Sequence, residues 1–309
     1  MTIKNTYSLL HAGFGNNLYQ IAFTLKQNRK YYSDIPLISI KKEDVKDIKF
    51  PTNLIYTINP LKDLCEFGGH PVNTTDEELP TNFKDIFPNL NIINDKDKIN
   101  KIFSNSNILL EQSPLNENQN DFFSGYANLI ERSTSGLNFI NHGVYYNLRN
   151  FHNEITHIQK KLQPSKVIVD YISKKYKNIL EYENTKVGVH LRFGYSVDNI
   201  LNQIVKKKEI LDIIDSYDET SIFVVCSDNI EKAKELLKNI DRRIIYIENE
   251  TMYVDFFLLI KMDHNILTMS TFSAWVALLN DSENKKVFCP TEFVNLHGKG
   301  SLPSDWELY

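Results

Sequence analysis

The stretch Val187-Gly188-Val189-His190-Leu191-Arg192-Phe193-Gly194 is the most informative segment of the chain. Its apolar residues predict a buried strand, and the glycine at its end predicts a turn. In open α/β sheets, ligands bind beyond the carboxyl ends of the strands, so His190 and Arg192 are expected at a binding edge. The planar guanidinium of Arg192 suits a phosphate group. The segment therefore predicts an α/β fold that binds an anion, with the pyrophosphate of a nucleotide sugar as the leading candidate.

Apolar strands alternate with helical patterns on both sides of this segment. Strands separated by helices pair in parallel through right-handed crossovers, so a parallel sheet is expected. The predicted strands are 186–191, 221–226, 243–247, 265–268 and 286–289, and the predicted helices are 167–176, 209–217, 230–237, 253–262 and 272–279.

The first half of the chain shows the same alternation less regularly. A strand over 7–11 precedes the turn Gly13-Phe14-Gly15-Asn16, and apolar residues then recur at helical spacing from Leu18. Further strands are expected at 36–40, 54–58, 91–93 and 107–110. Gln163-Pro164-Ser165 is the strongest boundary signal, because proline ends a helix and serine can cap the next one. Two Rossmann-like domains, 1–163 and 164–309, are therefore predicted.

Composition limits the partners of these 309 residues. The net charge of −4 gives no overall attraction to nucleic acid or to an anionic membrane. The three cysteines are far apart, which argues against a zinc knuckle or a disulfide framework and favours a reducing compartment. No signal peptide and no apolar run of about 18 residues is present. We therefore expect a cytoplasmic protein with no nucleic-acid partner and no stable membrane insertion.

Each candidate site has a plainer explanation beside it. His190 and Arg192 could be a half-buried histidine next to a surface arginine. Asp228 follows an apolar strand and could contact a ligand, although Ser227-Asp228-Asn229 also suits a helix cap. The segment Ser270-Thr271-Phe272-Ser273 could seat a phosphate at a helix N-terminus, or could be a cap with Trp275 in the core.

Two further segments carry weaker signals. The glycines of Gly13-Phe14-Gly15-Asn16 could let the backbone approach a ligand, but a plain turn explains them as well. Asp95-Lys96-Asp97 follows a short apolar stretch and could hold Mg²⁺ or Mn²⁺. Because charge runs are common in a chain rich in Asn, Lys and Asp, we interpret this segment as a solvated loop and expect no metal site.

Together these segments resemble the α-1,2-fucosyltransferase family, glycosyltransferase family 11. The resemblance spans nearly the whole chain and is densest from 187 to 275. It rests on Gly13-Phe14-Gly15-Asn16, His190-Leu191-Arg192, the run from Phe223 to Ser227-Asp228, His264-Asn265-Ile266, Ser270-Thr271-Phe272-Ser273-Ala274-Trp275, Pro303-Ser304-Asp305-Trp306 and Gly125-Tyr126.

The resemblance implies a GT-B architecture, with two Rossmann-like domains facing a cleft. It implies an inverting glycosyltransferase that needs no metal or other cofactor and moves fucose from GDP-fucose to the 2-hydroxyl of galactose in a glycan or glycoconjugate acceptor. The second domain would hold the donor, and the first would lie on the acceptor side. His190 and Asp228 would face the nucleoside, Arg192 would bind the β-phosphate, Ser270, Thr271, Phe272 and Ser273 would seat the phosphates, and Asn16 would reach the pyrophosphate.

Several positions depart from the family pattern. Phe193 stands where the family has a second arginine, Tyr195 replaces an aspartate, and Asn17, Asn229 and Met269 also differ. The lost guanidinium would remove a phosphate contact of about 1.5–3 kcal/mol. Lys206, Lys207 and Lys208 could supply a cation, although a solvated charge run is the favoured explanation. A different nucleotide sugar, or a catalytically weak nucleotide-sugar-binding protein, therefore remains an alternative.

Catalysis in such a site would depend first on stabilising the leaving group. Arg192 is the candidate for that role, because preorganised charge is commonly the largest catalytic contribution. Asp198 lies a few residues beyond the motif in a predicted loop, and it is the candidate general base for the acceptor hydroxyl.

Overall fold

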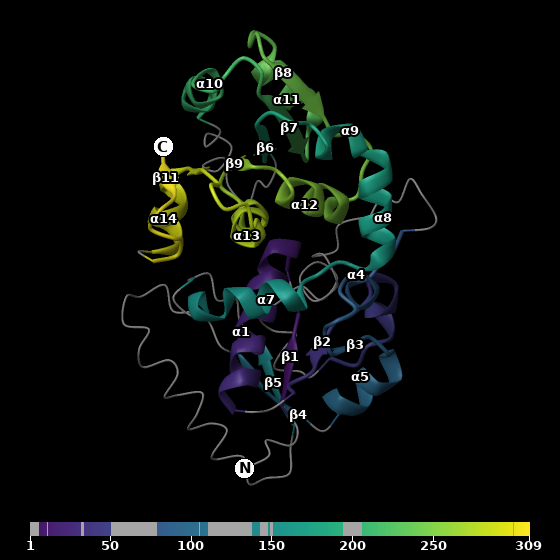
Figure 1. Ribbon diagram of the computed structural model, residues 1–309. Helices are drawn as coiled ribbons and strands as arrows, with labels where there is room; N and C mark the ends of the chain where they lie inside the picture. Colours follow the sequence, from purple (N-terminus) through teal and green to yellow (C-terminus); the bar gives the residue numbers. More distant parts are fainter. Residues whose placement is uncertain are drawn as a thin grey trace. The chain divides into compact units, whose positions relative to one another are not determined.

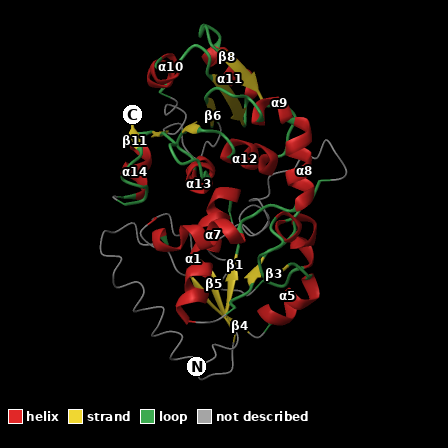
Figure 2. Cartoon of the chain, in the orientation of Figure 1, coloured by secondary structure: helices red, strands yellow, loops and turns green. Residues whose placement is uncertain are grey.

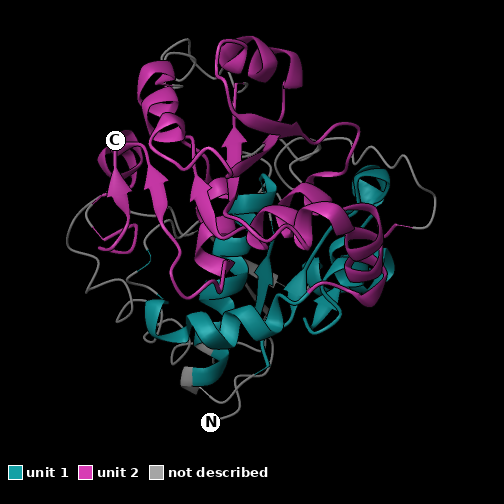
Figure 3. Ribbon diagram, turned by 45° about the horizontal axis from the view of Figure 1, so that its top comes forward, with its two compact units in different colours: residues 1–71, 81–163 teal, residues 72–80, 164–309 magenta. Residues whose placement is uncertain are grey.

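The computed structural model describes residues 6–10, 12–31, 34–50, 79–104, 106–110, 138–142, 148, 151–193, 206–298 and 300–309. The chain divides into two compact units, which Figure 3 shows in different colours. Unit 1 comprises residues 1–71 and 81–163, and unit 2 comprises residues 72–80 and 164–309. Strands and helices alternate in both units (Figure 2), as the α/β prediction requires.

Unit 1 is built on a five-stranded sheet with the order β3-β2-β1-β5-β4, in which every pairing is parallel. The strands are β1 (Thr6–Leu9), β2 (Leu37–Ile38), β3 (Ile92–Ile93), β4 (Ser106–Leu110) and β5 (Asn138–His142). The helices are α1 (Phe14–Tyr31), α4 (Phe83–Ile86), α5 (Lys96–Phe103) and α7 (Ile155–Lys161), with 3₁₀ turns at Lys42–Asp47 and His152–Glu154. The predicted strand over 54–58 lies outside the described residues.

Helix α1 begins earlier than the glycine pattern suggests. We predicted a turn over Gly13-Phe14-Gly15-Asn16, but the reversal occurs at Ala12, whose φ is 65°, and the helix starts at Phe14. Phe14 is buried, and its ring stacks on that of Phe83 with centroids 5.6 Å apart. The turn prediction was therefore wrong beyond Gly13, because burial of the Phe14 ring draws this residue into the first helical turn.

Unit 2 contains a six-stranded parallel sheet with the order β11-β10-β9-β6-β7-β8. Its strands are β6 (Lys186–Leu191), β7 (Ile222–Ser227), β8 (Arg243–Tyr246), β9 (His264–Ile266), β10 (Val287–Cys289) and β11 (Glu307–Leu308). Its helices are α8 (Lys166–Lys175), α9 (Lys177–Leu180), α10 (Lys207–Asp215), α11 (Ile230–Leu237), α12 (Met252–Ile260), α13 (Thr271–Leu279) and α14 (Thr291–His297), most of which Figure 1 labels.

The central strand β6 lies between β7 and β9. The register aligns His190 with Cys226 on one side and Val189 with Ile266 on the other. Since all three strands run in parallel, their carboxyl ends meet at one edge of the sheet. This edge holds the residues that follow β6, β7 and β9.

Helix α12 approaches β6 closely at Gly188, and a buried amide network fixes the loop beside it. Asn265 Nδ2 donates to the carbonyl of Leu259 at 3.2 Å, while Asn280 Nδ2 donates to Asn265 Oδ1 and to the carbonyl of Met262, both at 2.8 Å. Both asparagines are buried. Their amides therefore satisfy one another and bind the backbone carbonyls of Leu259 and Met262.

Glu250 holds helix α8 to the loop that precedes α12. Its side chain is 1% exposed, yet it accepts hydrogen bonds from the hydroxyls of Tyr171 at 2.9 Å and Tyr176 at 2.6 Å, and pairs with Lys175 Nζ at 2.5 Å. Three partners compensate for the burial of this charge. Helix α8, the first helix after Pro164, is thereby part of unit 2.

None of the helices in the described ranges combines the length and the apolar character needed to cross a membrane.

The substitution Gly188→Ala is expected to destabilise unit 2. A Cβ atom at this position would lie 2.9 Å from Asn265 Nδ2 and 3.1 Å from side-chain atoms of Leu259 and Met262. Overpacking of this kind costs about 1–3 kcal/mol, which urea denaturation would measure. Gly13→Ala is the matched control, because nothing lies within 4 Å of its Cβ position. Equal unfolding midpoints for the two variants would contradict this packing argument.

Candidate functional site

The carboxyl edge of the unit 2 sheet brings the predicted site residues of this unit together. His190 is the penultimate residue of β6, Arg192 follows that strand, and Asp228 follows β7. Thr268 follows β9, and the segment Ser270–Ser273 forms the start of α13. The site therefore depends on the parallel register described above.

His190 is buried in this edge. Its Nδ1 lies 2.7 Å from Ser273 Oγ, and its ring stacks on Phe272 with centroids 4.7 Å apart and an interplanar angle of 27°. Burial, together with the charge of Arg192, lowers the pKa of His190 to about 3. The ring is therefore neutral near pH 7 and acts as a hydrogen-bonding and packing group rather than as a cation.

Thr268 links the backbones on either side of Leu191. Its hydroxyl donates to the carbonyl of His190 and accepts from the backbone N–H of Arg192, both at 3.0 Å. The sequence interpretation assigned no role to this residue. The sequence signal was a hydroxyl at the last position of the predicted strand 265–268, which is too common to identify a role.

Asp228 orients the segment that carries Arg192. Its Oδ1 accepts from the backbone N–H of Phe193 at 2.8 Å, and its Oδ2 lies 3.4 Å from Arg192 Nε. Ser227 Oγ adds a hydrogen bond to the carbonyl of Leu191 at 2.7 Å. The arginine is therefore presented at the sheet edge with its backbone fixed and a carboxylate against one side of its guanidinium.

The helix-cap explanation of Ser227-Asp228-Asn229 holds for Asn229. Asn229 Oδ1 accepts from the backbone N–H of Lys232 at 3.0 Å, so Asn229 is the N-cap of α11. Asp228 makes no such capping bond. Capping and site residues are thus adjacent but distinct.

The start of α13 was explained above either as a phosphate seat or as a helix cap, and the structure shows features of both. Ser270 occupies the N-cap position with an extended backbone, but its side chain makes no capping hydrogen bond. Trp275 is fully buried and belongs to the core. A helix N-terminus attracts negative charge through its N–H groups and its dipole. Arg192 and this terminus therefore make the edge favourable for an anion.

Phe193 cannot supply the positive charge of the arginine that the family pattern has at this position. Its side chain packs against the apolar cluster formed by β6, β7 and α10. Two of the three lysines that could have supplied a cation are paired elsewhere: Lys206 pairs with Glu292 at 3.0 Å, and Lys208 pairs with Asp212. In the described part of this segment, Arg192 supplies the guanidinium at the sheet edge.

Asp255 is a buried carboxyl group that the sequence interpretation missed. Burial, together with the charge of Glu250, raises its pKa to about 8 against the lowering effect of a hydrogen bond with Cys226. The next residue, Phe256, packs edge-on against Phe272 with centroids 5.3 Å apart. Asp255 was overlooked because it lies within the strongly apolar run of α12.

The remaining predicted residues lie elsewhere in the chain. Asn16 is in the first turn of α1 in unit 1. Asp198 and Tyr195 lie outside the described residues. Asp95 is the N-cap of α5, where its Oδ1 accepts from the backbone N–H of Lys98 at 2.8 Å. This capping bond accounts for the position of Asp95 in its loop.

Comparison with solved structures defines the fold class. The chain resembles the fucosyltransferase NodZ from Bradyrhizobium with a TM-score of 0.50 and 15% identity, covering 89% of this chain and 93% of that one. It resembles POFUT1 in complex with GDP with a TM-score of 0.50 and 14% identity, covering 100% and 99%. The protein has the α/β fold of the GT-B type, and this part of the prediction is confirmed.

The sequence family follows from a match over nearly the whole chain. The profile of glycosyl transferase family 11 matches residues 6–298, and the chain belongs to this family. The resemblance deduced from the motifs is thereby confirmed.

Curated relatives in the family match at low identity. An alpha-1,2-colitosyltransferase of Escherichia coli is 27% identical over 195 residues, which are 59% of this chain and 66% of that protein. Galactoside alpha-(1,2)-fucosyltransferase 1 of Pan troglodytes is 23% identical over 189 residues, which are 49% and 51%. The chain thus spans half to two thirds of the length of these relatives.

The substitution Thr268→Val is expected to destabilise unit 2, because it leaves the carbonyl of His190 and the N–H of Arg192 without their shared partner. The cost should be about 1–3 kcal/mol in the free energy of unfolding, measured with urea. Thr268→Ser keeps the hydroxyl and should lose much less. Equal stability of the valine and serine variants would show that the bridge does not matter.

Proposed function

We propose that this protein is an inverting, metal-independent glycosyltransferase that moves fucose from GDP-fucose to a hydroxyl of a glycan acceptor. The 2-hydroxyl of galactose is the acceptor position that the family resemblance implies. The observation that carries the proposal is Arg192, fixed by Thr268 and Asp228 at the sheet edge next to the start of α13. Family membership and the fucosyltransferase fold support it.

The reaction would be a direct displacement at the anomeric carbon of the sugar. The bond to the pyrophosphate oxygen breaks as the acceptor oxygen attacks, so negative charge builds up on the departing diphosphate. Arg192 would bind the β-phosphate, and the N-terminal turn of α13, Ser270–Ser273, would seat the phosphates. Both groups are held in place before the reaction, which is the condition for effective electrostatic stabilisation.

The other site residues would position the donor. His190, being neutral and buried, would contribute through packing and through its hydrogen bond with Ser273. We assign His190 and Asp228 to the nucleoside end, Asn16 to the pyrophosphate from unit 1, and Asp198 to removal of the proton from the acceptor hydroxyl.

A second candidate donor is favoured by one relative and one substitution. The 27% identical protein of Escherichia coli is an alpha-1,2-colitosyltransferase, and Phe193 replaces a residue of the family's phosphate-binding motif. A colitosyl nucleotide is therefore the alternative to GDP-fucose.

A thermal-shift panel would test the donor. We expect GDP and GDP-fucose to raise the melting temperature and UDP to leave it unchanged. A response to UDP would reject the guanine nucleotide, and a larger response to a colitosyl donor would favour the second candidate. A response to GDP-fucose that EDTA abolishes would contradict metal independence.

Arg192→Ala is expected to lower kcat for fucosyl transfer by at least ~100-fold, because one preorganised donor to the leaving group is lost. Arg243→Ala is the matched control, since Arg243 begins β8 at the opposite edge of the sheet and is exposed. Steady-state kinetics with GDP-fucose would measure both variants. Near-normal turnover by Arg192→Ala would reject the assigned role.

A further inference from the structure

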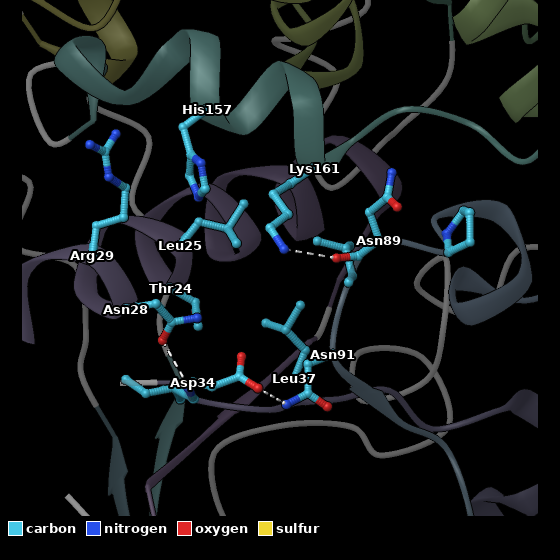
Figure 4. Close-up of a pocket in the computed structure, with 13 residues that line it drawn as sticks. Thr24, Leu25, Asn28, Arg29, Asp34, Leu37, Asn89, Asn91, His157 and Lys161 are labelled. Atoms are coloured by element: carbon cyan, nitrogen blue, oxygen red, sulfur yellow. Dashed lines mark hydrogen bonds between the residues drawn. The ribbon is translucent and has the colours of Figure 1, made fainter. Parts of the chain in front are cut away.

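Unit 1 contains an open pocket of about 480 Å³ that has no part in the proposed transfer site. It lies where the second half of α1, the residues preceding β2 and β3, and helix α7 come together (Figure 4). The strands contribute their amino ends, so the pocket is at the opposite edge of this sheet from the carboxyl ends. Its volume is within the range of small-molecule sites.

Two opposite charges face this pocket from different sides. Figure 4 shows Lys161 reaching in from α7 and Asp34 lying across from it. Among the described residues, no carboxylate pairs with Lys161, whose ammonium group donates to the carbonyl of Asn89 at 3.3 Å. Asp34 accepts from Asn91 Nδ2 at 2.8 Å and has no cationic partner in the same ranges. A lysine ammonium has three donors, so its contact with Asn89 leaves capacity for a ligand.

Two basic side chains, Arg29 and Lys161, line the pocket near His157. His157 lies beside Lys161 on the same helix face, and burial together with the charges of Arg29 and Lys161 lowers its pKa. Arg29 is itself paired with Glu154, which leaves Lys161 as the cation available to an anionic group.

The rest of the lining suits a hydroxyl-rich ligand. Leu25 and Leu37 provide a buried apolar floor, and Asn28 and Asn91 line the walls. Asn89 turns its backbone carbonyl toward Lys161, while its side chain points away to the carbonyl of Lys160 (Figure 4). A carboxylate can accept hydrogen bonds from hydroxyl groups, and an amide can both donate to them and accept from them, while an apolar floor can pack against the C–H face of a sugar ring.

We propose that this pocket binds an acidic saccharide, with the carboxylate of the sugar against Lys161 and its hydroxyls against Asp34 and the asparagine amides. The site does not depend on the fucosyl-transfer proposal. It is separate from the Asn16 segment, because Asn16 and Asn28 are twelve residues apart along α1, or roughly 18 Å at 1.5 Å per residue.

Ligand-observed NMR on the full chain would test this proposal with D-glucuronate, D-glucose and glycine. We expect glucuronate to bind at least about tenfold more tightly than glucose, the effect of one charge-assisted contact. Lys161→Met should weaken glucuronate binding about tenfold. Asp34→Asn should also weaken it. Lys160→Met is the matched control, because Lys160 is exposed, does not line the pocket and should leave binding unchanged.

Several results would overturn the site. These are the absence of glucuronate binding, equal binding of glucose, unchanged glucuronate binding by Lys161→Met, and glycine binding more tightly than glucuronate, which would indicate a zwitterion site. Displacement of glucuronate by saturating GDP would place the signal in the nucleotide site instead. If the protein binds glucuronate but does not bind GDP, the proposed function is rejected and this inference stands.

Discussion

The close approach of α12 to β6 at Gly188 is the constraint on which the site in unit 2 depends. A Cβ at this residue would lie 3.1 Å from a side-chain atom of Leu259 in α12 and 2.9 Å from the amide of Asn265 in β9, so neighbouring atoms would have to shift. The short separation lets α12 cover the sheet, which brings Phe256 against Phe272. Phe272 in turn stacks on His190. Backbone packing in the middle of β6 thus determines how a side chain at its end is held.

The edge of this sheet combines a rigid backbone with the guanidinium of Arg192 and the carboxylate of Asp228. Thr268, Asp228 and Ser227 each bond to the backbone between His190 and Phe193. Such a support reduces the reorganisation needed when charge develops on a bound phosphate. Phe193, which stands where the family pattern has a second arginine, packs against the apolar cluster.

The regular elements of unit 2 were predictable because apolar strands and amphipathic helices have different periods. Residues 186–191 and 230–237 were predicted with the bounds that the structure shows. Strand β5 was not predicted, because its Asn- and His-containing sequence has no clear apolar alternation. The start of α1 was wrong because ring stacking between Phe14 and Phe83, a contact distant in sequence, outweighs the local preference of two glycines.

The site was predictable to the extent that it follows strand ends. His190, Arg192 and Asp228 were placed at strand ends by that rule, the Ser270–Ser273 segment was proposed from the preference of helix N-termini for phosphate, and their roles were taken from the family resemblance. Thr268 and Asp255 could not be identified from that rule, because their roles arise from segments of the chain that pack beside them. The amides of Asn265 and Asn280 are similar: each lies in an apolar setting, and only the three-dimensional structure shows that they bind backbone carbonyls.

Strand β11 has a consequence for biosynthesis. It comes after every other strand of unit 2 in the sequence, yet it completes the sheet by pairing with β10, and the hydroxyl of Tyr309 donates to the carbonyl of Leu267. The ribosome delivers the chain from its amino end, and its exit tunnel conceals the most recently added residues. The β10 edge of this sheet therefore has no strand partner until residues 307–308 have left the tunnel.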